Sequence, residues 1–446
     1  ASALIAQSLA EKKNLKNIGI NWNEKDYKDD RQNLITRYLD YKKYIEINVN
    51  KDKYPFLNAK ELPIRYYPHG ANFFFPVGYV ALISNEEIKE EEFKDYSNEE
   101  FIGKLGVEER YQEILRGKPG VDVFIRDVYG HRMEISPDIL GDSSLYHNLL
   151  DTEEKPVNGT DIQLTLDVKL QNFIYEELFE FSAAAIILDV KDGAILSFVS
   201  TPSVDPNLFV KGISEKLWEK ISENEKNPLY NKIFQLYNPA STFKLFTAYS
   251  GLVNDLVKEK EFKPCRGKIK MYGVTKHCWR EYGHGRQTLE QAIKNSCNIF
   301  FYQLADRLGI EKMYKVAEEI KLTERTNIEL KGEKVPEIPN KKFKFERGIG
   351  DGRWYPPETL DVSIGQGFVR ITPIKLAQFT AFIANGGEMV SPHLIKKISG
   401  VIPENEEYLI KSAVSDSDLL QISEGMKKSV NNWGTAYRAL SKDLVI

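Results

Sequence analysis

The segment from Asn238 to Phe246, with the sequence NPASTFKLF, holds a serine and a lysine at a spacing that can make a nucleophile. Ser241 and Lys244 are three residues apart, so on a helix they share one face. We expect them in the first helical turn, where the helix dipole and burial both disfavour a charged amine. A neutral lysine can take the proton of the serine hydroxyl and activate it. The same spacing also arises by chance at ordinary helix starts, so other segments must decide.

Three cysteines, Cys265, Cys278 and Cys297, fall within 33 residues of a 446-residue chain. Their odd, low number argues against a disulfide framework, and such clustering is unusual for scattered core cysteines. The net charge of −4 gives no indication of a basic face for nucleic acid. No stretch approaches about 18 consecutive apolar residues, and the first ten residues are unlike a signal peptide. The sequence therefore predicts no membrane span within itself.

The elements that must position the Ser–Lys pair begin near residue 156. Residues 161–167 alternate like a strand, and residues 168–181 read as a helix. Apolar runs at 184–189 and 193–200, joined through Asp192-Gly193, predict a hairpin. Later helices are predicted over residues 289–296, 300–308, 311–319, 373–384 and 416–429. A few strands followed by a mostly helical stretch is typical of the α+β class.

The first 155 residues are charged and mixed, and they carry no evident chemistry. The expected elements there are helices over 8–16 and 26–44, a helix that follows residues 102–108 and runs through Leu115, strands over 44–49, 121–128 and 132–135, and an acidic surface insertion over 88–100. We interpret this half as an extended, strand-rich spacer with helical inserts. The total length predicts two or three domains.

Several motifs, in order along the chain, resemble those of class B penicillin-binding proteins, the serine D,D-transpeptidases that cross-link peptidoglycan. Residues 241–244 resemble the family's Ser-x-x-Lys motif, and residues 296–298, Ser-Cys-Asn, resemble its Ser-x-Asn motif. Other matching landmarks are residues 103–108, 115–117, 164–167, 192–196, 364–367 and 372–373. Features at 205–207, 212–214, 228–231, 283–285 and 354 are similar to the elongation-type branch, penicillin-binding protein 2.

The resemblance has a large departure at the C-terminal end. The family's third motif, Lys-Thr-Gly or Lys-Ser-Gly on a strand, should follow a Gly-Thr-Ala. Gly434-Thr435-Ala436 is present, but the sequence ends at Ile446 before such a strand. The family's N-terminal transmembrane helix is also missing. We therefore expect an incomplete ectodomain, inactive alone, rather than a naturally truncated protein. Smaller departures are Asn238-Pro239-Ala240 for Pro-Pro-Gly and Asn298 where this branch often has aspartate.

The resemblance implies acyl-transfer roles for four residues. Ser241 attacks the carbonyl of a penultimate D-alanine and forms an acyl-enzyme. Lys244 is the candidate base, although the acylation base of this motif class is disputed. Ser296 passes a proton to the leaving amine, and Asn298 holds Lys244 and the substrate amide. The oxyanion is met by the backbone N–H of Ser241 and by one from the third strand, and a β-lactam acylates Ser241 by the same path.

Cys265, Cys278, His284 and Cys297 follow the spacing C-x12-C-x5-H-x12-C. A Cys3His set is a closed tetrahedral site, which predicts a structural zinc ion. Some penicillin-binding protein 2 members resemble this, with a zinc site here made from Asp, His and Cys. Because Cys297 lies inside the second motif, a metal there would fix the loop that presents the catalytic side chains.

Three alternatives to this zinc site stay open. In the first, Cys278 and Cys297 are small core hydrophobic residues and His284 is a satisfied surface residue. In the second, Cys265 and Cys278 form a disulfide in an oxidising compartment. The third is that His277 replaces His284 as a ligand, which its adjacency to Cys278 makes the second choice.

We therefore expect an α+β protein in which a pedestal (dimerisation-type) domain with a helical head insert, residues 1–155, precedes a penicillin-binding, serine β-lactamase-like transpeptidase domain, residues 156–446. The resemblance implies cross-linking of peptidoglycan stem peptides during cell elongation, inhibition by β-lactams, and a periplasmic domain anchored in the bacterial inner membrane. It also implies a RodA-type glycan polymerase and an elongation scaffold protein as partners. The alternatives are a division-type transpeptidase and, if the third motif is truly absent, a non-catalytic β-lactam-binding sensor or scaffold.

Overall fold

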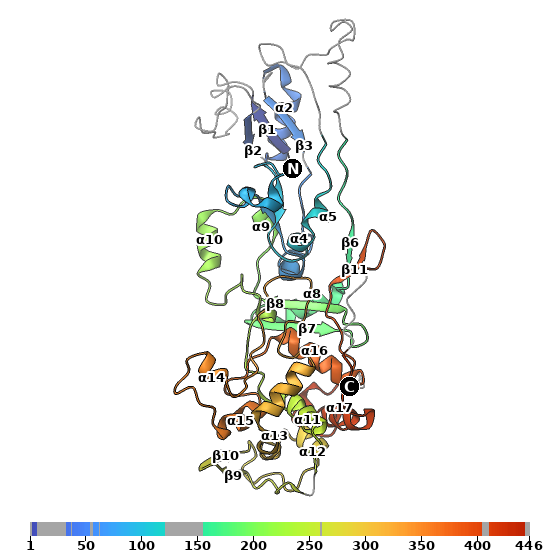
Figure 1. Ribbon diagram of the computed structural model, residues 1–446. Coiled ribbons are helices and arrows are strands. Elements are labelled where there is room, and N and C mark those ends of the chain that lie inside the picture. The colour runs from blue at the N-terminus through green and yellow to red at the C-terminus, as the bar shows by residue number, and fades with distance from the viewer. Residues whose placement is uncertain are drawn as a thin grey trace, which may run out of the picture.

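The computed structural model describes residues 2–6, 33–36, 38–53, 57–61, 63–120, 155–258, 261–403 and 410–441. The molecule is elongated, with the N-terminal strands at one end and a helical body at the other (Figure 1). The predicted α+β class is confirmed: small antiparallel sheets stand beside a cluster of helices. Among the described helices, none combines the length and apolar character that crossing a membrane requires.

A three-stranded antiparallel sheet lies at the N-terminal end, with β1 (Ser2–Ala6) between β2 (Asn33–Thr36) and β3 (Leu57–Glu61). Helix α2 (Tyr41–Val49) packs near β3. Two predictions are wrong here, since residues 44–49 are helical and the helix predicted over 26–44 contains β2. Six alternating residues are too few to distinguish the periodicity of a strand from that of a helix. The side chain of Asp40 accepts the backbone N–H of Lys42 and so caps a helix.

The middle of the molecule pairs β4 (Val80–Leu82) with β5 (Phe101–Gly103). The single helix predicted to follow residues 102–108 and run through Leu115 is two short ones, α4 (Gly106–Arg110) and α5 (Gln112–Arg116), and α3 (Phe74–Val77) precedes them. The short 3-10 helices are η3 (Lys51–Lys53), η4 (Gly70–Phe73), η5 (Glu87–Lys89) and η6 (Glu91–Phe93). Segments 8–16, 121–128 and 132–135 lie outside the described residues.

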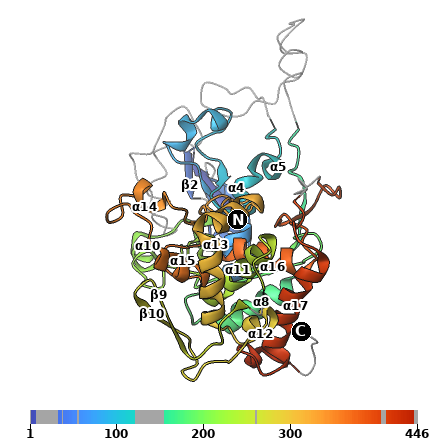
Figure 2. The same cartoon turned by 60° about the horizontal axis from the view of Figure 1, so that its bottom comes forward.

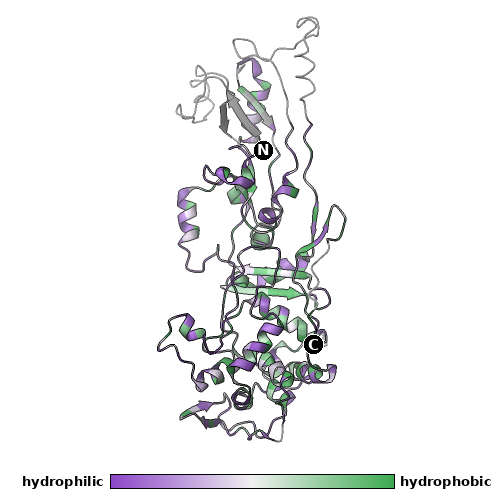
Figure 3. Ribbon diagram, viewed as in Figure 1, coloured by the Kyte–Doolittle hydropathy of each residue, from purple (hydrophilic) through white to green (hydrophobic). Residues whose placement is uncertain are grey.

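The body starts with β6 (Ile162–Leu164), which pairs with β11 (Ile395–Ile398), and α8 (Val168–Leu178). The predicted hairpin is confirmed as β7 (Ala183–Leu188) and β8 (Ile195–Thr201), and the apolar character of β7 stands out in Figure 3. The other elements are α9 (Asn207–Val210), α10 (Glu215–Ser222), η7 (Lys232–Phe234), η8 (Ala240–Phe243), α11 (Lys244–Val253), β9 (Lys268–Met271), β10 (Val274–His277), α12 (Leu289–Lys294), α13 (Asn298–Glu319), α14 (Phe343–Glu346), α15 (Pro356–Ser363), α16 (Pro373–Ala384), α17 (Asp416–Asn431) and η10 (Tyr437–Ala439).

The main core surrounds α11 and α13, which Figure 2 shows side by side with α15, α16, α12 and α17 around them. Its largest buried side chains include Phe246, Tyr249, Phe301 and Phe382. Burying each such ring stabilises the fold by about 1.5–3 kcal/mol. Helix α13 bends at Gly309, whose φ of 67° matches the break between the two predicted helices. The start of α11, where Lys244 lies, is thus held in a rigid core.

A second core joins the pedestal to the body. Phe74 and Val107, from the pedestal side, share an apolar cluster with Phe198 and Phe234 beside β7 and β8. A polar contact runs alongside, since Asn207 accepts the N–H of Tyr67 at 3.0 Å and donates to its carbonyl at 2.9 Å. Movement of one half against the other must therefore break packed contacts.

Candidate active site and metal cluster

Ser241 and Lys244 lie where the chain passes from the 3-10 turn η8 into α11. The Nζ atom of Lys244 is 3.2 Å from the Oγ atom of Ser241. Lys244 is only 2% exposed, whereas Ser241 is open to solvent. Burial lowers the pKa of Lys244 to about 8, although the nearby cysteines act in the opposite direction. The pair thus places a partly neutral amine against an accessible hydroxyl.

The second motif meets the same amine. Lys244 Nζ is 2.8 Å from Ser296 Oγ, 2.9 Å from Ser296 O and 2.6 Å from Asn298 Oδ1. With Ser241, four oxygen atoms surround one nitrogen, and an ammonium has three protons to donate. A neutral amine can instead donate to Ser296 O and Asn298 Oδ1 while its lone pair accepts the proton of Ser241. The predicted catalytic residues Ser241, Ser296 and Asn298 therefore all lie around the amine nitrogen of the fourth, Lys244.

The turn that carries Ser241 is held by a glycine that sequence reasoning identified only as a landmark. Ala240 donates its N–H to the carbonyl of Gly365 at 2.9 Å. Gly365 has a φ of 74°, and a Cβ atom at this position would lie 2.0 Å from the carbonyl oxygen of Ala240. A larger residue would therefore push the turn that carries Ser241. The sequence marks this glycine through the Gly-Gln-Gly at 365–367, but it does not reveal that Gly365 contacts Ala240.

A cleft of about 690 Å³ opens above Ser241. Its lining includes Ser241, Asn295, Ser296, Asn298, Ile364 and Gln366 on the side of the two motifs, with Trp279, Arg280, His284, Trp433, Gly434, Thr435 and Tyr437 completing the wall. The sequence analysis did not single out Trp279, Arg280, Trp433 or Tyr437. Their positions are the one signal they share: Trp279 and Arg280 follow Cys278, and Trp433 and Tyr437 flank the Gly-Thr-Ala at 434–436.

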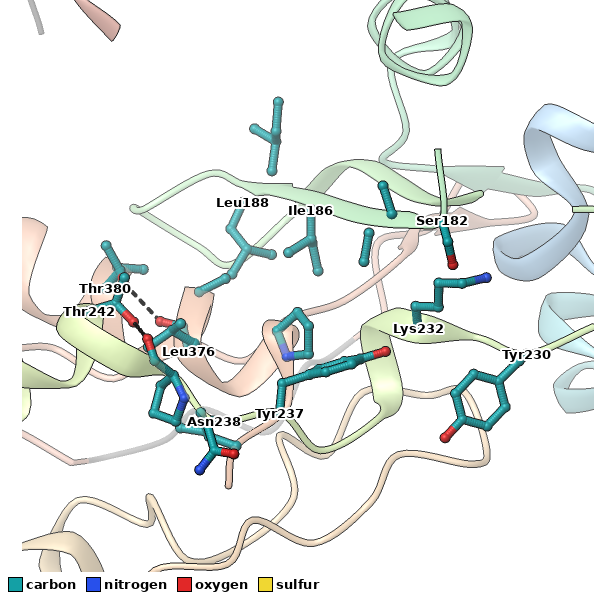
Figure 4. Close-up of a pocket in the computed structure, with 18 of the residues that line it drawn as sticks. Ser182, Ile186, Leu188, Tyr230, Lys232, Tyr237, Asn238, Thr242, Leu376 and Thr380 are labelled. Carbon is teal, nitrogen blue, oxygen red and sulfur yellow. Dashed lines mark hydrogen bonds between the residues drawn. The ribbon is translucent and has the colours of Figure 1, made fainter. Parts of the chain in front are cut away.

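A larger groove of about 900 Å³ lies against β7 (Figure 4). Ile186 and Leu188 point from β7 into it, opposite Tyr237 and Leu376. The groove reaches the side of the nucleophile turn at Thr242, but Ser241 and Lys244 are not in its lining. We therefore place the candidate chemistry in the smaller cleft.

The predicted metal ligands also come together. The ligand atoms of Cys265, Cys278, His284 and Cys297 all lie within 4.8 Å of one another. His284 Nδ1 is 3.7 Å from Cys265 Sγ and 3.5 Å from Cys278 Sγ. A tetrahedral zinc ion, with bonds of about 2.3 Å to sulfur and about 2.1 Å to nitrogen, separates S and N by roughly 3.6 Å. The cluster can hold a metal ion of this size.

Two of the alternatives for these residues do not match the structure. All three cysteines are free, so Cys265 and Cys278 are not joined by a disulfide. His277 is exposed and lies outside the cluster; its carbonyl instead accepts the side-chain N–H of Asn298 at 3.1 Å.

The backbone around the cluster explains why His284 reaches Cys265. The N–H of Cys265 donates to Gly285 O at 2.8 Å, and the N–H of Gly285 donates back at 3.0 Å. Gly283 has a φ of 77°, and a Cβ atom there would lie 2.1 Å from Cys265 O. A hydrogen bond between the sulfur atoms of Cys278 and Cys297 lowers the pKa of Cys278 and raises the pKa of Cys297.

The Cys/His cluster is connected to the loop of the second motif, residues 296–298, by two routes. Cys297 lies between Ser296 and Asn298, both of which contact the amine of Lys244. Trp279 packs its ring 5.2 Å from that of His284 and donates its indole N–H to Asn295 O at 2.9 Å. Ordering of the cluster therefore orders the backbone on both sides of Ser296.

Comparisons with known proteins decide the family. The family described as Penicillin binding protein transpeptidase domain matches residues 183–444, more than half of the chain. This chain belongs to the penicillin-binding transpeptidase family. The Penicillin-binding Protein dimerisation domain matches residues 3–141 of this transpeptidase-family chain. The resemblance read from the motifs is thereby confirmed.

The curated relatives that this penicillin-binding protein resembles include peptidoglycan D,D-transpeptidases and another penicillin-binding protein. The peptidoglycan D,D-transpeptidase MrdA of Acinetobacter baumannii is 33% identical over 356 residues, which are 79% of this chain and 50% of that protein. Penicillin-binding protein 3 of Bacillus subtilis is 30% identical over 391 residues, which are 86% of this chain and 53% of that protein. The chain spans about half the length of the curated relatives it matches.

Solved structures agree with this assignment. The complex of penicillin-binding protein 2 with MreC from Helicobacter pylori is similar, with a TM-score of 0.80, 25% identity, and coverage of 99% of this chain and 82% of that one. Penicillin-binding protein 2 of Pseudomonas aeruginosa, in complex with WCK 5153, has a TM-score of 0.68 and 30% identity, covering 86% of this chain and 79% of that one.

Proposed function

We propose that this chain supplies the nucleophile, Ser241, for the acyl transfer of an elongation-type peptidoglycan D,D-transpeptidase, whose third-motif strand is needed for activity. The observation that carries the proposal is the buried Lys244 amine, within hydrogen-bond distance of Ser241, Ser296 and Asn298. The relatives named as peptidoglycan D,D-transpeptidases support the substrate class.

In the proposed reaction, neutral Lys244 takes the proton of Ser241 while Oγ bonds to the carbonyl carbon of a penultimate D-alanine. The backbone N–H of Ser241 stabilises the oxyanion. The amide C–N bond then breaks, and Ser296 delivers a proton, replenished from Lys244, to the departing D-alanine amine. The amine of a second stem peptide attacks the acyl-enzyme, gives up its proton along the same path, and releases Ser241 with the cross-link formed. Asn298 holds Lys244 and the substrate amide.

Mass spectrometry of the protein that includes the third-motif strand, incubated with a β-lactam, tests this proposal; residues 1–446 alone are expected to be inactive. We expect an added mass equal to one opened β-lactam, located by peptide mapping on Ser241. The Ser241→Ala variant should gain no mass. Thr242→Ala is the matched control, because its hydroxyl donates to Pro239 O at 2.6 Å and not to Lys244, and it should still be labelled. An adduct on any residue other than Ser241 would contradict the proposal.

The rate of acylation should depend on pH through Lys244. Because the pKa of the buried amine is lowered to about 8, the amine is mostly charged at pH 6 and mostly neutral at pH 9. The second-order rate constant for β-lactam acylation should therefore rise with pH, by about tenfold per unit well below the pKa, and level off above pH 8. Stopped-flow measurement from pH 6 to 9.5 gives this profile, and a flat profile would exclude Lys244 as the base.

We further propose that the Cys/His cluster binds a zinc ion with a structural role. The donor set of three sulfur atoms and one imidazole nitrogen suits zinc, and the 3.5–3.7 Å separations of His284 Nδ1 from two sulfurs fit a tetrahedron. Zinc bound there would fix the positions of the four side chains and, through Cys297, the backbone between Ser296 and Asn298. The closed donor set leaves no position for a reacting water.

We propose that residues 1–155 form the pedestal and residues 156–446 the transpeptidase domain, which the matches to residues 3–141 and 183–444 support. The bacterial relatives support a periplasmic enzyme anchored in the inner membrane. The complex of a similar protein with MreC and the similarity to a peptidoglycan synthase complex support a scaffold protein and a glycan polymerase as partners. Co-purification of the tagged protein from cells with a polymerase of this kind tests that assembly, and repeated isolation without it would count against it.

A further inference from the structure

The cleft above Ser241 is biased toward negatively charged ligands. Among the described residues that line it, none is an aspartate or glutamate, and Arg280 is the one with a permanent charge. The Arg280 side chain is exposed, and no ion pair joins it to another described residue. An unneutralised guanidinium in a concave site attracts carboxylates and can bind them through two parallel hydrogen bonds.

The backbone that carries Arg280 is fixed at both ends. The backbone N–H of Arg280 faces the sulfur of Cys278, and its carbonyl accepts the N–H of Gly283 at 3.0 Å. The preceding residue, Trp279, is tied to Asn295 by its indole N–H. The guanidinium therefore extends from a rigid base at the edge of the cleft, which limits the entropy lost when it binds a ligand.

Exposed aromatic side chains line the same cleft. Trp433 is 86% exposed and stacks on Tyr437 with ring centroids 6.0 Å apart, while Trp279 is 60% exposed. Trp433 also has a φ of 57°, a left-handed conformation that is costly for such a residue. Large apolar side chains kept in water by a strained backbone indicate a surface that contacts a ligand.

The position of Arg280 indicates which part of a stem peptide it meets. The segment 277–280 runs beside Asn298, whose side chain donates to His277 O at 3.1 Å. Asn298 is the residue proposed above to hold the substrate amide, and we assign that amide to the acyl side of the scissile bond. Arg280 thus lies on the side of the cleft that receives the part of the peptide remaining on Ser241.

We propose that Arg280 is a specificity-determining residue that binds a carboxylate of the donor stem peptide on the acyl side, outside the D-alanyl-D-alanine unit. The inference rests on the proposed transpeptidase function and names its substrate preference. Donors that keep this carboxylate free are used faster than donors in which it is a carboxamide. Trp279 and Trp433 supply apolar surface for the same segment.

The test uses two peptides ending in D-alanyl-D-alanine that differ only in the preceding residue, which carries either a side-chain carboxylate or its carboxamide. For acyl-enzyme formation by the intact protein, we expect kcat/KM about tenfold higher for the acid. Arg280→Gln should lower kcat/KM for the acid donor to the value for the amide donor. The kcat/KM of the amide donor and the rate of acylation by a β-lactam should not change. Arg280→Lys should retain part of the preference for the acid donor. Arg438→Gln is the control and should retain all of it, because it removes an exposed charge next to Tyr437 but outside the cleft lining.

Other outcomes would overturn the inference. Equal rates for the two peptides with the unaltered protein, or an equal loss for both in Arg280→Gln, would remove the proposed selectivity. A matching loss of β-lactam acylation would assign Arg280 to the terminal carboxylate, which β-lactams also carry. Binding of both peptides to the Ser241→Ala variant, measured by calorimetry, gives the same comparison without turnover. Absence of any β-lactam adduct on the unaltered protein would instead refute the transpeptidase function itself.

Discussion

Replacing Lys244 with methionine lowers the rate constant for acylation of Ser241 by a β-lactam by about 10²–10⁴-fold, the usual contribution of a positioned base. Methionine nearly preserves the length of the side chain but has no lone pair that can take the Ser241 proton across the 3.2 Å separation. Single-turnover labelling, followed by mass spectrometry at constant protein concentration, measures this ratio. The circular dichroism spectrum should stay unchanged, because the acceptors that lose the amine belong to Ser296 and Asn298, which line the cleft and can bind water instead.

Lys375 provides a matched control for this experiment. It is also 2% exposed, and burial lowers its pKa to about 8. Its Nζ atom, however, donates to Gln378 and to the carbonyls of Lys321 and Arg325, and not to any catalytic residue. Lys375→Met should therefore cost stability, because it leaves buried acceptors unpaired, while the folded fraction acylates at the normal rate. Equal acylation defects in the two variants would show that Lys244 acts only through the fold.

Loss of the metal site is expected to have the second large effect. In Cys297→Ser the cluster has three of its four predicted ligands, so native mass spectrometry should show no bound zinc. Removal of a structural metal destabilises a protein by several kcal/mol, and thermal unfolding should begin several degrees lower. Acylation of Ser241 should fall as well, because residue 297 lies between Ser296 and Asn298.

Treatment with a chelator distinguishes the effect of losing zinc from the effect of changing the packing around Cys297. Stripping zinc from the unaltered protein should lower its unfolding temperature, whereas the same treatment should leave Cys297→Ser unaffected. His277→Ala is the control, because His277 lies outside the cluster and should not alter zinc content. A native mass without metal, together with an unfolding temperature insensitive to the chelator, would reject the zinc site.

Local sequence patterns predicted the long, regular elements well. Helix α16 begins at Pro373 and ends at Ala384, as expected from its N-terminal proline and apolar run. The β7–β8 hairpin follows from Asp192-Gly193 between two apolar strands. Short elements in the pedestal were less determined, since the alternation at 44–49 fits a strand locally while Asp40 and burial of Ile47 select the helix α2.

The sequence by itself determined the residue types of the candidate site: a serine and lysine at helical spacing, a second Ser-x-Asn, and a set of three cysteines and a histidine. Their meeting was decided by tertiary structure, because residues 52 positions apart approach only when α11 packs against α13. The same packing buries Lys244, and burial is what lowers its pKa. Arg280 and Trp433 share a cleft for the same reason: their 153-residue separation is closed by the folded chain alone.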